Sequence, residues 1–189
     1  LVKLGRRIAN YQLSLFIIYS ASLAIMLTGS WYLTYPQRNE RVHFPGYNVT
    51  SADMETAKFI HDNAASAEKD YIVLSNILTA AATIDQYGFA KYYDTTEGQT
   101  FYYSIPTGGI LYTQYNKMIY QDQKREFMQE AMDMTNTKLA YFAISSYWAD
   151  ANKIIEGAKK SADSWQTIND GRVWVFVYRS RDLKNSQSQ

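Results

Sequence analysis

The 189-residue chain contains no cysteine and only two histidines. Without cysteine it can form no disulfide and no thiolate nucleophile, and most zinc sites are excluded. The histidines, His43 and His61, lie far apart in the sequence, which argues against a metal site. A formal net charge of +1 offers no basic surface for nucleic acid. We therefore expect no metal, no cofactor and no nucleic-acid partner.

Charge is missing from one long stretch, which runs from Ile8 to Gln37. It covers about 30 residues, whereas a helix needs only about 20 to cross the hydrocarbon core of a bilayer. The apolar segment Tyr11–Leu33 ends on Trp31 and Tyr32, and such rings favour the headgroup layer. We predict that residues 1–35 form a cytoplasmic loop and a transmembrane helix.

The flanking charges predict the orientation of this span. Three basic residues precede it, and two follow it together with Glu40. A basic excess marks the cytoplasmic side, so everything after the span is expected outside the plasma membrane. The preceding basic residues are Lys3, Arg6 and Arg7.

Two other interpretations of the apolar stretch stay open. It could be the core helix of a soluble protein, or a signal peptide cleaved after Ser20–Ser22 or Thr28–Ser30. The chain begins with Leu1 rather than Met. We expect it to be an excerpt of a longer polypeptide, whose upstream transmembrane region would be a partner of the domain.

Three segments are expected after the span. Residues 36–49 form a proline-containing linker, in which Asn48-Val49-Thr50 is an N-glycosylation sequon. Residues 50–180 form one soluble extracytoplasmic domain, long enough to have its own core. Residues 181–189 are polar and are expected to be a disordered tail.

The soluble part alternates helical and strand patterns, which is typical of the α/β class. We predict an N-terminal transmembrane helix followed by an α/β sandwich, with a mixed sheet of about four to six strands that ends in a β-hairpin. The expected helices are 50–63, 77–87, 110–119, 121–135 and 149–162. The expected strands are 71–74, 89–93, 100–105, 139–144, 165–168 and 172–178.

Two of these helices are expected to begin directly after strands, where α/β proteins bind ligands. Ser75-Asn76 can cap the first, and the glycines of Pro106–Gly109 could bring backbone amides close to the phosphate of a lipid-linked sugar. The predicted ligand-binding residues are Ser75, Asn76, Thr107, Gly108, Gly109 and Tyr112. The alternative is a plain strand-to-helix turn, because the Walker lysine is missing.

No residue is predicted to be catalytic. The carboxylate pairs have spacings of solvated helix faces, and no serine lies in a G-x-S-x-G context. The 17 tyrosines suit interfaces and sugar-facing surfaces. The alternative explanation for so many tyrosines is a domain that lies against a membrane and has hydrated interfaces.

The chain resembles the last span and C-terminal extracytoplasmic domain of polytopic GT-C-type membrane glycosyltransferases, which use lipid-phosphate-linked sugars. The resemblance covers essentially the whole chain in arrangement, without a diagnostic motif. The runs that carry it are AKFIHDN (57–63), YIVLSN (71–76) with Ala80, YSIPTGGILY (103–112), ADSW (162–165) and DGRVWVF (170–176).

The resemblance implies a non-catalytic module that acts as a lid or as an acceptor-docking surface. The family's catalytic acid lies in an early extracytoplasmic loop, so no catalytic residue transfers to this chain. The implied partners are the lipid bilayer and a lipid-linked sugar or glycan acceptor. The alternatives are a single-pass extracytoplasmic binding or sensor domain, and a membrane-anchored enzyme with its site near Ser75, Asn76 and Thr107.

Overall fold

The structure is a computed structural model that describes residues 2–34, 48–67, 70–106 and 108–181. Most of the predicted linker, the tail from residue 182 and the candidate ligand residue Thr107 lie outside the described residues. The other predicted elements and site residues can be placed in the fold.

The first helix, α1 (Val2–Thr34), contains the apolar stretch. Within it, Gln12–Thr34 has a mean hydropathy of 1.7, and none of this segment is buried against the rest of the protein. The helix is therefore not part of the core that the described residues form, whereas the signal-peptide interpretation stays open. The segment is long and apolar enough to span a membrane.

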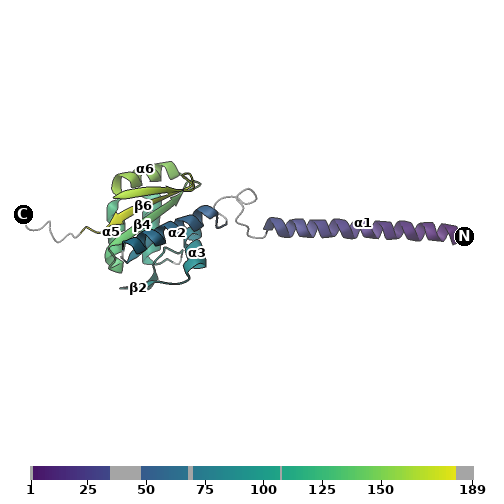
Figure 1. Ribbon diagram of the computed structural model, residues 1–189, viewed down its shortest axis with the longest axis horizontal. Coiled ribbons are helices and arrows are strands. Elements are labelled where there is room, and N and C mark those ends of the chain that lie inside the picture. The colour runs from purple at the N-terminus through teal and green to yellow at the C-terminus, as the bar shows by residue number, and fades with distance from the viewer. Residues whose placement is uncertain (1, 35–47, 68–69, 107, 182–189) are drawn as a thin grey trace, which may run out of the picture.

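The remaining elements form an α/β sandwich (Figure 1). The central sheet has the strand order β1-β4-β6-β5, in which β1 and β4 are parallel and the other pairs antiparallel. A separate hairpin contains β2 and β3. The elements are α2 (Ser51–Ser66), β1 (Tyr71–Leu74), α3 (Ile77–Tyr87), β2 (Tyr92–Thr95), β3 (Gly98–Phe101), α4 (Ile110–Tyr120), α5 (Arg125–Thr135), β4 (Leu139–Ser145), α6 (Ala151–Ser161), β5 (Ser164–Ile168) and β6 (Val173–Arg179).

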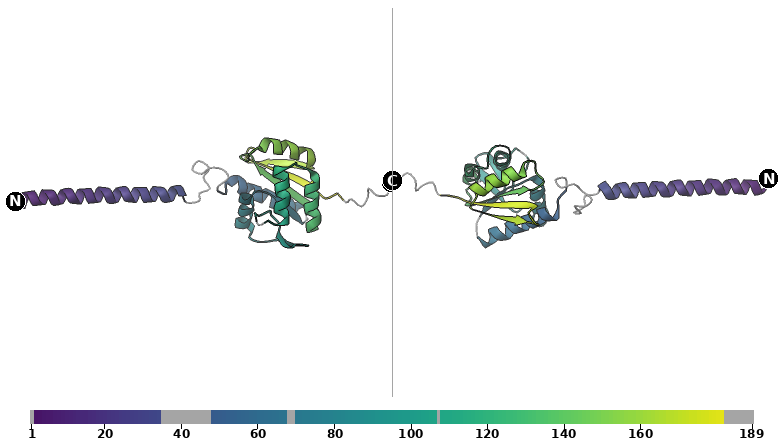
Figure 2. Two further views of the ribbon diagram at one scale, coloured as in Figure 1. Left: turned by 180° about the vertical axis from the view of Figure 1, so that it is seen from behind. Right: turned by 90° about the horizontal axis from the view of Figure 1, so that it is seen from above.

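Helices cover both faces of this sheet, as the views of Figure 2 show. Strand β4 is buried along its whole length because its side chains alternate between two cores. Phe142 packs with α4, α5 and α6, whereas Tyr141 packs with α2. The predicted mixed sheet ending in a β-hairpin is confirmed.

The helix starts follow the predicted caps. Thr50 and Asp53 form a complete capping box at α2, and Asn76 caps α3 by accepting a hydrogen bond from the Thr79 amide. Helix α3 has the predicted bounds and ends at Gly88, whose φ of +68° favours glycine.

The predicted strands 89–93 and 100–105 are wrong in extent, because the strands are Tyr92–Thr95 and Gly98–Phe101. The hairpin of β2 and β3 turns at Thr96-Glu97 and is closed by Gly98, whose φ of +111° suits glycine. The chain then leaves this hairpin and runs beside β1, where the Ser104 amide donates to the Val73 carbonyl at 2.9 Å. An aromatic run such as Thr100–Ile105 favours extended backbone but does not select its neighbour.

Other boundaries also differ from the prediction, such as the end of α2, which lies at Ser66 rather than at residue 63. Helix α5 begins at Arg125 rather than residue 121, because Lys124 is still extended. Helix α6 begins at Ala151, because Asp150 has a left-handed backbone (φ +59°). The loop between β5 and β6 covers residues 169–172, one residue more than predicted, and Asn169, Asp170 and Gly171 all have positive φ.

Candidate functional site

The predicted site lies where the parallel strands β1 and β4 end. Asn76 follows β1, and its side-chain amide donates to Ser145 Oγ (3.1 Å) at the end of β4 and to Tyr147 Oη (2.8 Å). Its carbonyl oxygen accepts from the amide of Thr79 at 2.9 Å. Asn76 therefore ties both strand ends to α3 and fixes the position of Tyr147.

A buried carboxylate extends this network to α2. Asp53 is 2% exposed, and its Oδ2 accepts from the amide and hydroxyl of Thr50 at 3.0 and 2.8 Å. Its Oδ1 accepts from Thr79 Oγ1 at 3.2 Å. The first turns of α2 and α3 thus meet at one carboxylate, and the positive ends of both helix dipoles stabilise it.

The backbone of Ser75 is hydrogen-bonded to Ser104 within the fold. Its amide donates to Ser104 Oγ at 2.8 Å, and the Ser104 hydroxyl donates back to the Ser75 carbonyl at 2.7 Å. Both side chains are 1% exposed. This pair joins β1 to the segment beside it, and it leaves the Ser75 side chain away from the surface.

Tyr115 and Tyr147, which lie near this edge, are neutral at physiological pH because burial raises the pKa of both phenols. Tyr112 stacks on Tyr115 of the same helix, with ring centroids 6.2 Å apart. The Tyr115 hydroxyl is buried and has no hydrogen-bond partner among the described residues. Burial, and then the charge of Asp53, raises the pKa of Tyr147 to about 12. The phenols of Tyr115 and Tyr147 can donate hydrogen bonds but cannot act as bases near pH 7.

The structure places the predicted glycines apart from this network. Gly108 has a φ of +80°, which suits glycine, and Gly109 caps α4 without a side-chain hydrogen bond. Gly109 lines a pocket of about 190 Å³ between α4 and the hairpin, and neither Ser75 nor Asn76 lines it. The predicted ligand residues therefore lie in two places rather than in one cleft.

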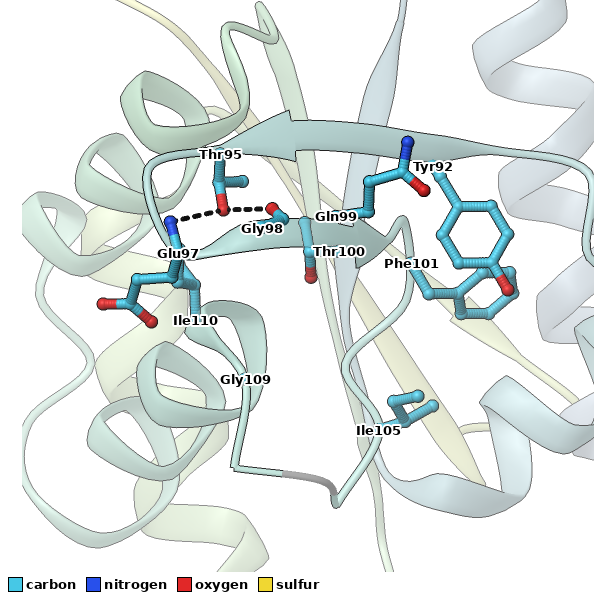
Figure 3. A pocket seen from close by; sticks show the side chains of 10 residues that line it. All are labelled: Tyr92, Thr95, Glu97, Gly98, Gln99, Thr100, Phe101, Ile105, Gly109 and Ile110. Carbon is cyan, nitrogen blue, oxygen red and sulfur yellow. Dashed lines mark hydrogen bonds between the residues drawn. The ribbon is translucent and has the colours of Figure 1, made fainter.

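Figure 3 shows the chemistry of this pocket. The rings of Tyr92 and Phe101 form one wall, with centroids 5.5 Å apart. Thr100 points from β3 toward the loop that carries Gly109 (Figure 3). Glu97 lies at the end of the pocket away from the two rings (Figure 3). The lining residues are Tyr92, Thr95, Glu97, Gly98, Gln99, Thr100, Phe101, Ile105, Gly109 and Ile110.

This lining suits a small neutral ligand with one apolar face and several hydroxyl groups. The aromatic wall extends to Phe89, which is 64% exposed. The centroid of its ring lies 5.7 Å from the centroid of the Phe101 ring. A carboxylate accepts hydrogen bonds from hydroxyl groups, whereas no lining residue carries a positive charge for an anion. The volume is below the 300–1,000 Å³ or so of sites for drug-sized ligands, so about one ring would fit.

Sequence reasoning missed the pocket residues of the hairpin. The signal that could have found them is the turn sequence Thr-Thr-Glu-Gly between aromatic residues, which is typical of a hairpin with a glycine in the last turn position. Within residues 2–34, 48–67, 70–106 and 108–181, no group of three or more His, Asp or Glu side chains could hold a metal ion. The sequon residue Asn48 is partly exposed, and its glycosylation stays a prediction.

Comparisons of the chain with protein-family models, curated proteins and solved structures found no match. The fold class is therefore given by the structure alone. Three features of the structure bear on function: the apolar helix α1, the hydrogen-bond network around Asn76, and the pocket beside the hairpin.

Proposed function

We propose that the chain is a non-catalytic extracytoplasmic module of an integral-membrane glycosyltransferase that uses a lipid-phosphate-linked sugar. The module would act as an acceptor-docking surface or as a lid. The observation that carries this proposal is the small pocket with an aromatic wall and a hydroxyl- and carboxylate-bearing rim, on a domain that follows an apolar helix.

The apolar helix supports the membrane part of the proposal. None of the segment Gln12–Thr34 is buried against the other described residues, and lipid is the solvent that suits such an apolar surface. The basic residues before it favour a cytoplasmic N-terminus, which would place the α/β domain outside the plasma membrane.

The strand-end network supports a non-catalytic role. Ser75 and Asn76 occupy the positions where an α/β enzyme would present reactive groups, yet their hydrogen bonds join parts of the fold. A side chain that caps a helix and joins two strands is not available as a nucleophile or base. Catalysis is then assigned to other parts of the parent protein.

The pocket supports docking of a glycan. Aromatic rings stack on the apolar face of a pyranose, and the hydroxyl of Thr100 and the carboxylate of Glu97 can bond its hydroxyl groups. Because Tyr92 is 50% exposed and Phe89 is 64% exposed, the ring would be reached from solvent.

A single-pass binding or sensor domain is the second candidate. It fits the same observations as the first candidate, an apolar helix followed by a domain with a pocket. In that case the same pocket would bind its ligand without an attached transferase.

The native size of the polypeptide separates the two candidates. An antibody raised against residues 48–181 would be used on blots of membranes from the source organism. The transferase module predicts a band far above the 21.8 kDa of this chain, with the domain digested by protease added from outside. A membrane band near 21.8 kDa would exclude the transferase module and favour the binding domain.

A further inference from the structure

We infer that the end of the sheet where β1 and β4 terminate docks on the headgroup layer of the bilayer, through Ile77, Tyr147 and Trp148. The inference depends on the proposal that α1 spans a membrane. It adds an orientation, in which the domain would lie with this end on the lipid rather than moving freely on its tether. We call these three residues the docking edge.

The docking edge presents apolar surface to solvent. Ile77 is 52% exposed at the first position of α3, and Tyr147 is 38% exposed after β4. The Trp148 ring lies beside Tyr147, with centroids 6.4 Å apart, and is partly buried. Tyrosine and tryptophan are the residues that favour the membrane interface, because their rings are amphipathic.

The docking edge is held rigidly. Tyr147 accepts a hydrogen bond from Asn76, the residue before Ile77, at 2.8 Å. The loop that carries Tyr147 is fixed to the start of β6, since the Ser146 amide donates to the Arg172 carbonyl at 2.8 Å. A rigid apolar edge loses little conformational entropy when it enters an interface.

The same edge is the end of the domain at which the membrane tether arrives. Thr50 at the start of α2 is joined to Tyr147 by successive hydrogen bonds: Thr50 to Asp53, the Thr79 hydroxyl to Asp53, the Thr79 amide to Asn76, and Asn76 to Tyr147. Figure 1 shows the first turn of α2 at the same end of the sheet as the loop between β5 and β6. Because the chain enters the domain at this end, it is the end of the domain nearest in sequence to α1.

The opposite end of the sheet differs in chemistry. There β4 begins and β6 ends, and charged side chains such as Arg125, Asp163 and Arg181 gather. Chain connectivity and surface chemistry therefore select the same end for contact with lipid.

The charges near the docking edge indicate which lipid it suits. The acidic residues at this end, Glu55, Asp150 and Asp170, outnumber the basic residues Lys153 and Arg172. Attraction to anionic lipid needs basic residues, so this edge is not suited to it. We therefore expect docking on zwitterionic phosphatidylcholine, driven by the apolar side chains, without strengthening by phosphatidylserine.

The absence of cysteine makes a direct test possible, because one introduced thiol gives one labelled position. The whole 189-residue chain would be inserted into phosphatidylcholine nanodiscs with a fluorophore on Ser146→Cys, an exposed position next to Tyr147. The matched control carries the label on Met134→Cys, which is 42% exposed near the start of β4. A third label on Leu23→Cys reports insertion of α1.

We expect headgroup-attached quenchers to quench the Ser146 label severalfold more than the Met134 label, while aqueous iodide shows the reverse order. Adding Ile77→Asp to the Ser146→Cys chain should remove the difference, and Asp at this exposed first helical position is compatible with folding. Equal quenching at both positions would overturn docking. A Ser146 label shielded from lipid and iodide alike would also overturn it, because protein would then cover the edge. A Leu23 label outside the acyl chains would overturn the membrane proposal itself.

Discussion

The ion pair of Arg125 and Asp163 should be a measurable part of the domain's stability. Both guanidinium Nη atoms bond to the carboxylate, at 2.9 and 2.7 Å. Arg125 also donates to the carbonyls of Ser161 (3.0 Å) and Arg179 (2.8 Å), and the Arg179 amide donates to Asp163 Oδ2 at 2.7 Å. The pair thus joins the start of α5 to the ends of α6 and β6.

The expected magnitude follows from this geometry. A hydrogen bond to a charged group contributes about 1.5–3 kcal/mol when buried, and bidentate geometry adds to it. The side chains are 14% and 23% exposed, so water replaces part of what is lost. We expect Arg125→Ala and Asp163→Ala to be coupled by about 2 kcal/mol in a double-mutant cycle. The solvent-exposed pair Lys58–Asp62 is the control and should show a much smaller coupling energy.

The same pair predicts a pH dependence. Partial burial alone would raise the pKa of Asp163, but the hydrogen bonds from Arg125 and from the Arg179 amide outweigh burial and lower the pKa below 3.8. A carboxyl with a depressed folded pKa stabilises the protein fully above its unfolded pKa, about 3.9, and less as pH falls toward the folded value. The stability gap between the wild type and Asp163→Asn should therefore be constant from pH 5 to 7 and shrink below pH 4.

Urea unfolding of the chain in detergent micelles, followed by tryptophan fluorescence, measures both effects. A coupling energy as small as that of Lys58–Asp62 would refute the argument, and so would a stability gap that stays constant down to about pH 2.

Three further changes have defined outcomes. Asn76→Ala should lower the free energy of unfolding by about 2 kcal/mol in urea titrations, because the cap and the bonds to β4 are lost, whereas Asn76→Ser should recover part of it. Tyr92→Ala should abolish saturation-transfer NMR signals from a monosaccharide that binds the wild type, while Tyr120→Ala, at an exposed ring away from the pocket, should keep them. Gly98→Ala should cost about 1 kcal/mol in thermal unfolding, since its φ of +111° strains any side chain, and an unchanged melting temperature would contradict this reasoning.

Local signals in the sequence predicted much of the fold. The strand Tyr71–Leu74, the Asn76 cap and the helix Ile77–Tyr87 have the predicted bounds, because a buried strand, a capping side chain and a terminal glycine each act over a few residues. The same applies to the Thr50–Asp53 capping box. The exposed apolar helix follows from composition alone.

Long-range partners could not be predicted in this way. The hydrogen bond from Asn76 to Tyr147 joins residues far apart in the sequence. No local pattern indicates that Asn76, which was predicted to bind a ligand, would instead bond to another part of the fold. Similarly, Tyr102–Ser104 leaves the hairpin to run beside β1, because tertiary packing rather than propensity selects a strand's neighbour. The pocket depends on that choice, so its lining could not be assembled from the sequence.

The claim that α1 spans the membrane and holds the α/β domain outside it is tested most directly by measuring on which side the domain lies. Single-cysteine variants would be treated with a membrane-impermeant maleimide on intact cells that express the chain. We predict that Lys58→Cys, on the exposed side of α2, is labelled on intact cells, and that Val2→Cys is labelled only after permeabilisation. Labelling in the opposite order, or recovery of the chain in the soluble fraction, would contradict the claim that α1 spans the membrane and holds the α/β domain outside it.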